Sequence, residues 1–156
     1  MGDPSSVQAP SYNHPWDKIL SSGHPLLVIF QSLNTAISHT QLDQSHDDKW
    51  SFIEYWIDPI IHRLLSIDPP SEADITTALL YEMCRLGICV FVGSIRRNCG
   101  KLGASTKVYV KKLKELLSHP GNANVVMVPR MFILWILFFG MLESVGLDEE
   151  EWFLAC

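Results

Sequence analysis

The stretch MFILWILFFGML, residues 131–142, decides the fold class, because twelve residues without a polar side chain follow one another between Arg130 and Glu143. A membrane-spanning helix needs about 20 such residues, so the stretch has the length of a helix buried in a protein core. Since it is apolar on every side, we expect a helix over 129–144 near the centre of the molecule. We predict no membrane span, and membrane attachment through residues 131–142 remains an alternative.

A second apolar segment lies upstream, over residues 78–93. Its β-branched run 88–92 is compatible with a strand, but the Ala-Leu-Leu and Met-Cys-Arg-Leu context before it favours a helix over 71–98. Elsewhere, apolar residues recur at spacings of three and four, and Pro59 is expected to kink or split one of the resulting helices. We therefore predict an all-α fold, a single irregular array of about five or six helices with two central apolar helices, over residues 25–40, 47–67, 71–98, 105–118, 129–144 and 148–154.

The two ends of the chain differ from this middle part. Residues 1–23 are rich in serine and proline without sustained periodicity, so we expect a flexible N-terminal leader ahead of one helical domain over 24–156. Residues 1–11 hold no basic residue and no apolar run, which is untypical of a secretory or transit peptide. We expect the nucleus or the cytoplasm. The last amphipathic pattern stops at Cys156, so we also expect a domain that is truncated at its C-terminus.

Composition and motifs argue against several function classes. The formal net charge of −5 disfavours a whole-domain nucleic-acid binder, which needs an excess of lysine and arginine. The sequence holds no G-x-S-x-G, Walker, H-E-x-x-H or G-x-G-x-x-G motif, so we predict that the protein is not an enzyme.

Metal and cofactor sites are also not expected. No C-x-x-C pair exists, and the cysteines are expected to be small buried residues of a reducing compartment: Cys84, Cys89, Cys99 and Cys156. Polar residues gather around 39–48, where a solvated loop is favoured over a metal site: His39, His46, Asp47 and Asp48. We predict no metal and no cofactor.

Charge is unevenly distributed along the chain. Between Glu82 and Glu115 there is no acidic residue, while eight residues are basic. Such a block is typical of a solvated or internally paired face, and an acidic protein or nucleic acid remains as an alternative partner. The candidate partner-binding residues are Arg96, Arg97, Lys107, Lys111 and Lys114.

Aromatic residues concentrate in the last quarter of the chain, where they are numerous enough to line an apolar pocket for a small effector. Aromatic stripes at helical spacing are also typical of an ordinary core, which is the favoured alternative. The candidate pocket residues are Trp135, Phe138, Phe139, Trp152 and Phe153.

Residues 130–140 (RMFILWILFFG), followed by Trp152-Phe153, resemble the end of the fungal-specific regulatory domain of zinc-cluster transcription factors. The segment 95–100 (IRRNCG) and the Lys- and Leu-rich helix after it are similar in order and spacing to the same region. The resemblance covers roughly residues 24–156 and brings no catalytic residue. It implies an all-helical domain that transmits a signal through partners, while a separate six-cysteine zinc cluster reads DNA. These 156 residues hold four cysteines, and Glu151 stands where the family pattern leads us to expect a basic residue.

The sequence thus predicts a transcription-regulator-like effector domain without its own zinc cluster, acting through contacts with a protein partner or as a homo-oligomer. Direct nucleic-acid binding by this chain alone is not expected. The alternative is a helical protein unrelated to transcription that serves as a scaffold or binds a small-molecule effector.

Overall fold

The computed structural model describes residues 24–39, 51–67, 75–100, 106–119 and 130–156. In these ranges it has six α-helices, one π-helical turn and no strand, which confirms the predicted all-α fold. The strand alternative for residues 88–92 is wrong, because they lie inside a long helix. The elements are α1 (Pro25–His39), η2 (Ile53–Ile57), α3 (Asp58–Leu65), α4 (Ile75–Asn98), α5 (Lys107–Ser118), α6 (Arg130–Ser144) and α7 (Glu150–Ala155). The predicted leader 1–23, residues 40–48 of the predicted loop and the predicted start of the second helix lie outside the described residues. His39, grouped with that loop in the sequence analysis, is the last residue of α1.

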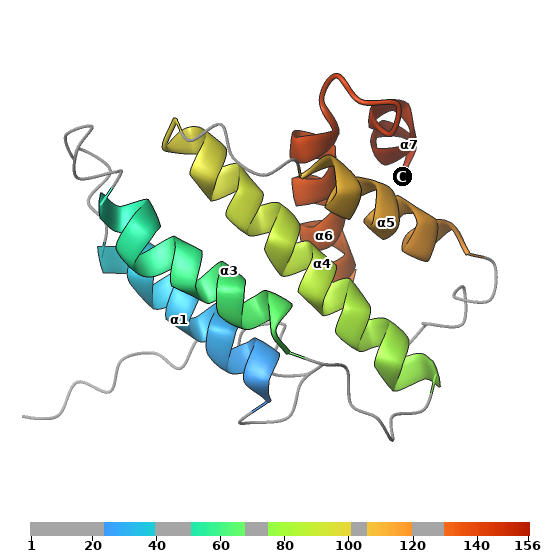
Figure 1. Cartoon of the computed structure of the whole chain (residues 1–156). Coiled ribbons are helices and arrows are strands. Elements are labelled where there is room, and N and C mark those ends of the chain that lie inside the picture. The colour runs from blue at the N-terminus through green and yellow to red at the C-terminus, as the bar shows by residue number, and fades with distance from the viewer. Residues whose placement is uncertain (1–23, 40–50, 68–74, 101–105, 120–129) are drawn as a thin grey trace, which may run out of the picture.

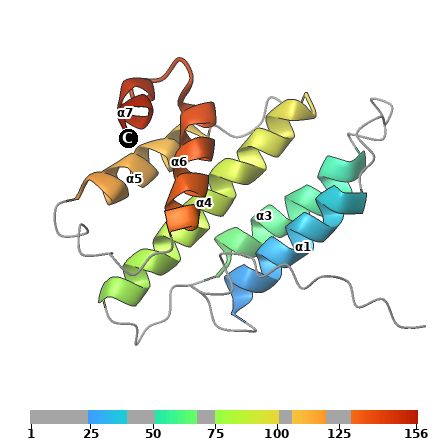
Figure 2. The same ribbon diagram turned by 180° about the vertical axis from the view of Figure 1, so that it is seen from behind.

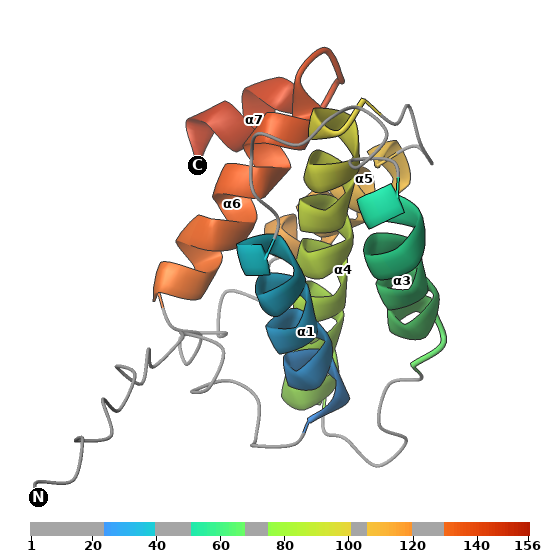
Figure 3. The same ribbon diagram turned by 90° about the vertical axis from the view of Figure 1, so that its left-hand side faces the viewer.

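Helix α4 runs through the middle of the molecule, with α1 and α3 along one side and α5, α6 and α7 along the other (Figure 1). Figure 1 looks onto α3 and α5, and Figure 2, from behind, looks onto α1 and α6. Figure 3 shows α6 and α3 on opposite sides of α4. The two sides therefore meet mainly through α4.

The sequence of α4 explains its central place, because buried residues occur on every side of it. Residues 86–90 are buried without a break, whereas a helix at a surface shows a single apolar stripe. Among the described helices, α4 alone is long and apolar enough to cross a membrane, but 56% of the relevant window is buried inside the fold. A core helix passes the same test of length and composition.

Helix α6 contacts α4, α5 and α7, yet it is not enclosed on all sides as its composition led us to expect. Phe132, Ile136 and Gly140 face the core and are buried. On the other face, Met131, Leu134 and Phe138 are 63%, 58% and 52% exposed. Hydropathy alone does not reveal this difference, because both faces consist of large apolar residues.

The predicted irregularity at Pro59 takes the form of a π-helical turn over Ile53–Ile57, directly before α3. The amide of Asp58 donates to the carbonyl of Ile53, five residues back, which is the π pattern. Proline lacks an N–H and its ring crowds the carbonyl four residues before it, so the wider turn lets the helix continue past Pro59. The same turn points Asp58 toward α4, where it meets Arg96.

Candidate functional site

The two arginines of the predicted partner-binding face are engaged in ion pairs within the fold. Arg96 Nη1 lies 3.2 Å from Asp58 Oδ1, which ties α4 to α3. Arg97 Nη2 lies 2.6 Å from Glu143 Oε1 and also donates to the carbonyl of Leu142 at 2.9 Å, which ties α4 to α6. Their acidic partners are 38 and 46 residues away in the sequence, so charge patterning along the chain could not reveal these pairs.

The three lysines of that face lie on α5. Lys107 and Lys111 border a hollow of about 350 Å³ whose opposite wall includes Asp148 and Glu149. Lys114 is half-buried. Ion pairs within the fold thus engage the two arginines, whereas Lys107 and Lys111 are exposed at the rim of this hollow.

Two of the predicted pocket residues are packed in an aromatic cluster that joins α1, α4 and α6. The Trp135 ring centroid lies 5.7 Å from that of Phe30, 5.3 Å from that of Phe91 and 5.1 Å from that of Phe139. The Phe91 and Phe139 rings meet edge-to-face at 4.6 Å. This is the geometry of cohesive core packing.

Of the other three predicted pocket residues, Phe138 touches this cluster from the outer face of α6, with its ring centroid 5.2 Å from that of Phe139. Trp152 and Phe153 lie on α7. Phe153 is buried against α6, where a Cβ on Gly140 would overlap its ring, and Trp152 stacks edge-on against Phe153 at 4.9 Å. Phe138 points to the outer face of α6, more than half exposed. None of the five aromatics lines either of the two cavities described in this section.

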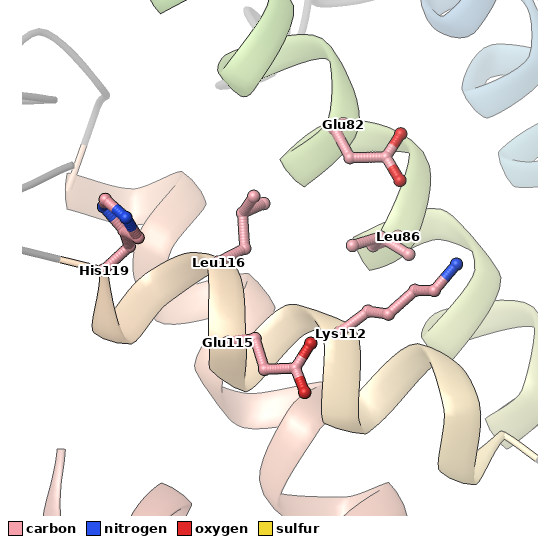
Figure 4. Close-up of a pocket in the computed structure, with 6 residues that line it drawn as sticks. All are labelled: Glu82, Leu86, Lys112, Glu115, Leu116 and His119. Atoms are coloured by element: carbon pink, nitrogen blue, oxygen red, sulfur yellow. The ribbon is translucent and has the colours of Figure 1, made fainter. Parts of the chain in front are cut away.

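A groove between α4 and α5 was not predicted. It has a volume of about 460 Å³, and Figure 4 shows side chains of α4 on one side of it and side chains of α5 on the other. Leu86 and Leu116 form its apolar part. The charged and titratable lining residues are Glu82, Lys112, Glu115 and His119, and Glu82 is itself held by Arg85 through two hydrogen bonds of 2.8 and 2.7 Å. The lining therefore mixes both charges around a small apolar floor.

The buried thiols in α4 are poor nucleophiles. Burial raises the pKa of Cys84, and it raises the pKa of Cys89 to about 12, so both stay protonated near neutral pH. In the part of the chain that the structure describes, no group of three or more His, Cys, Asp or Glu side chains is placed to hold a metal ion.

The open face of α6 is the feature that sequence analysis missed. Its exposed residues Met131, Leu134 and Phe138 are joined at the end of the helix by Val145, which is 63% exposed. We call these four side chains the α6 row. Exposed large apolar residues that gather on one side of a helix mark a candidate interaction site.

Comparison with protein-family models, curated proteins and solved structures finds no significant match to this chain. The resemblance of residues 24–156 to a fungal regulatory domain therefore stays a hypothesis.

Proposed function

We propose that this chain is a regulatory domain of the kind carried by fungal zinc-cluster transcription factors, and that it acts in the nucleus through protein contacts made by the α6 row. The α6 row is the observation that carries the proposal. Its first three residues lie within residues 130–140, the stretch on which the family resemblance rests.

The energetics of the row support a role in binding. Full burial of a large apolar side chain stabilises a complex by about 1.5–3 kcal/mol, and each member of the row has more than half of its surface still to bury. In the folded chain these side chains remain exposed to water, so this stabilisation is not realised by folding. A protein partner that covers the row would gain it, whereas the charges of Arg96 and Arg97 are already engaged within the fold.

The chemistry of the described residues also favours binding over catalysis. A cysteine nucleophile must ionise, and burial holds Cys84 and Cys89 in the neutral thiol form. Arg97 and Glu143 are engaged with each other and hold helices together.

A reporter assay tests the proposal. The full chain is fused to a DNA-binding domain that has no regulatory activity of its own, and expression of a reporter gene in yeast nuclei is measured. We expect a change of several-fold relative to the DNA-binding domain alone. The variant Leu134→Lys should lose it, whereas Leu65→Lys, at an exposed leucine of α3 on the opposite side of α4, should keep it. Reporter expression that does not respond to the wild-type fusion would contradict the proposal.

The second candidate function, binding of a small effector, is favoured by the α4–α5 groove. Its volume falls in the range of small-molecule sites, and its lining suits a compact molecule with both charges and an apolar part. NMR titration with neutral amino acids as probes should shift amide signals of Leu86 and Leu116, and Lys112→Met should abolish the shifts. Signals that do not move at millimolar probe concentrations would rule out this class of ligand.

A further inference from the structure

The α6 row has the spacing of a helix–helix seam. With the half-buried Met141 included, the row runs at intervals of three, four, three and four residues: Met131, Leu134, Phe138, Met141 and Val145. This is the a/d repeat with which one helix packs along another, and it continues over about four turns. A small ligand needs no such period, so the row fits the side of a second helix.

The residues beside the seam do not oppose such packing. The neighbouring positions on its two edges are Trp135, Leu137, Leu142 and Ser144, and none of them carries a charge. Charges that would select a foreign partner in a heptad pairing are therefore missing from the edges of this seam. Charge lies only at its two ends.

The ends of the seam carry opposite charges. Arg130, at the first residue of α6, is exposed. Its charge there opposes the helix dipole, so it does not stabilise α6 itself. Beyond Val145 the chain turns at Gly146, which has a positive φ of 76°, and the next segment, residues 148–151, is entirely acidic with Asp148 exposed.

This pattern is complementary to itself in only one orientation. A second α6 running parallel would place arginine beside arginine and the acidic segments beside each other. An antiparallel α6 places Arg130 of each copy beside the acidic segment of the other, and Phe138, midway between Met131 and Val145, faces its own counterpart at the two-fold axis. A surface of this kind is what a two-fold symmetric dimer requires.

We infer that the occupant of the α6 row is a second copy of this chain, bound through an antiparallel α6–α6 seam. The inference deepens the proposed function and rests on it, because it names the protein partner. The seam is shorter than a standard interface, so the dimer forms weakly, with a dissociation constant on the order of 10 μM.

Sedimentation equilibrium of the full chain between about 1 and 500 μM tests the inference. The wild-type protein should pass from monomer to dimer across this range. Phe138→Lys places two like charges at the two-fold axis and should weaken association at least tenfold, whereas the control Leu65→Lys should leave it unchanged. A monomer at every concentration, or a dimer that Phe138→Lys does not weaken, would overturn the inference.

The orientation is tested by charge reversal at the ends. Arg130→Glu and Asp148→Lys should each weaken the dimer several-fold at low salt. The double variant should restore it, because the introduced carboxylate of each copy then faces the introduced ammonium group of the other. In 1 M salt the variants should converge. Single variants that bind as tightly as wild type, or a double variant that binds no better than either, would overturn the antiparallel seam.

Two further measurements keep the outcomes distinct. Far-UV circular dichroism of each variant confirms that it is folded, so that a lost dimer is not mistaken for a lost fold. A monomeric wild-type chain that still regulates the reporter would refute the dimer and leave the proposed function standing.

Discussion

Arg97 Nη2 lies 2.6 Å from Oε1 of Glu143, at the point where α4, α6 and the start of α5 meet. The Glu143 side chain is 3% exposed, and its other oxygen accepts a hydrogen bond from Thr106 Oγ1 at 3.0 Å. Thr106 stands directly before α5. One buried carboxylate thus links α4, α6 and the start of α5, because Arg97 donates to one of its oxygens and Thr106 to the other.

Removal of the arginine should therefore destabilise the fold. Arg97→Met leaves a buried carboxylate without its charged partner, a change that costs about 3–5 kcal/mol at a fully buried pair. Half of the Arg97 side chain is exposed, so water replaces part of the interaction and we expect a loss of about 2 kcal/mol. Urea denaturation measures it. The control Arg63→Met, at an exposed arginine of α3, should change stability by less than about 0.5 kcal/mol. Equal losses in the two variants would contradict the role of the pair.

The same junction depends on the absence of a side chain at Gly93. A Cβ there would overlap Cγ2 of Thr106, so Gly93→Ala forces Thr106 away from Glu143. We expect a loss of about 1–3 kcal/mol, although alanine is the better helix former. Thr106→Ser removes the obstructing methyl and keeps the hydroxyl. In that background the nearest remaining atoms are at 3.5 and 3.8 Å, and Gly93→Ala should be neutral or stabilising. A double-mutant cycle by urea denaturation with no coupling between the two sites would contradict this packing.

Local sequence signals were sufficient for most of the helices. The apolar spacing of three and four residues predicted the ranges of α1 and α5 closely, because such spacing reflects which side of a helix is buried. The unbroken apolar run predicted the range of α6. Pro59 correctly marked an irregularity, since its missing N–H is a local property. The all-round apolar character of α4 predicted its central place.

Long-range relations were not accessible in the same way. The acidic partners of Arg96 and Arg97 are distant in sequence, so the sequence could not show which residues of the basic block form ion pairs within the fold. The aromatics of α6 and α7 were grouped by proximity in the chain. In the fold, Trp135 packs against α1 and α4, Phe138 lies half exposed beside Phe139, and Phe153 is buried against Gly140. The α6 row could not be predicted because hydropathy does not distinguish an apolar residue in the core from one on the surface.

The contact between Gly140 and Phe153 should control the docking of α7. A Cβ on Gly140 would overlap three ring atoms of Phe153, so Gly140→Ala should expel this ring from its buried site. Hydrogen exchange of the α7 amides should then accelerate at least tenfold, while that of the α4 amides changes little. Gly87→Ala serves as the control: its Cβ would lie 3.1 Å from the Trp135 ring, so it perturbs α6 without touching α7. Gly146→Ala would not serve, because the positive φ of Gly146 strains any other residue. Unchanged exchange in α7 after Gly140→Ala would contradict this packing.

Cysteine labelling should follow burial and pKa. Cys156 is exposed, whereas Cys84 and Cys89 are buried. Because the pKa of Cys89 is raised to about 12, its thiolate fraction at pH 8 is about 10³-fold lower than that of an ordinary thiol. Iodoacetamide should therefore label Cys156 within minutes and leave Cys84 and Cys89 unmodified until urea unfolds the chain. Peptide mass spectrometry identifies the labelled sites, and early modification of either α4 cysteine would contradict the burial of this helix.

The same two thiols should make the fold sensitive to alkaline pH. In the unfolded chain they ionise with a pKa near the ordinary value of 9.0, whereas burial raises the pKa of both in the folded protein. Above pH 9 the unfolded state therefore binds fewer protons than the folded state, and stability falls with rising pH. Each thiol contributes a slope that approaches about 1.4 kcal/mol per pH unit before the folded pKa is reached.

Urea denaturation at pH 8, 9, 10 and 10.5 measures the slope. The variant Cys84→Ala/Cys89→Ala starts from a lower stability because it creates a small cavity, but its decline between pH 9 and 10.5 should be clearly shallower than that of the wild type. Titratable groups far from these cysteines contribute alike in both proteins, so parallel slopes would mean that these thiols ionise as readily in the folded chain as in the unfolded one.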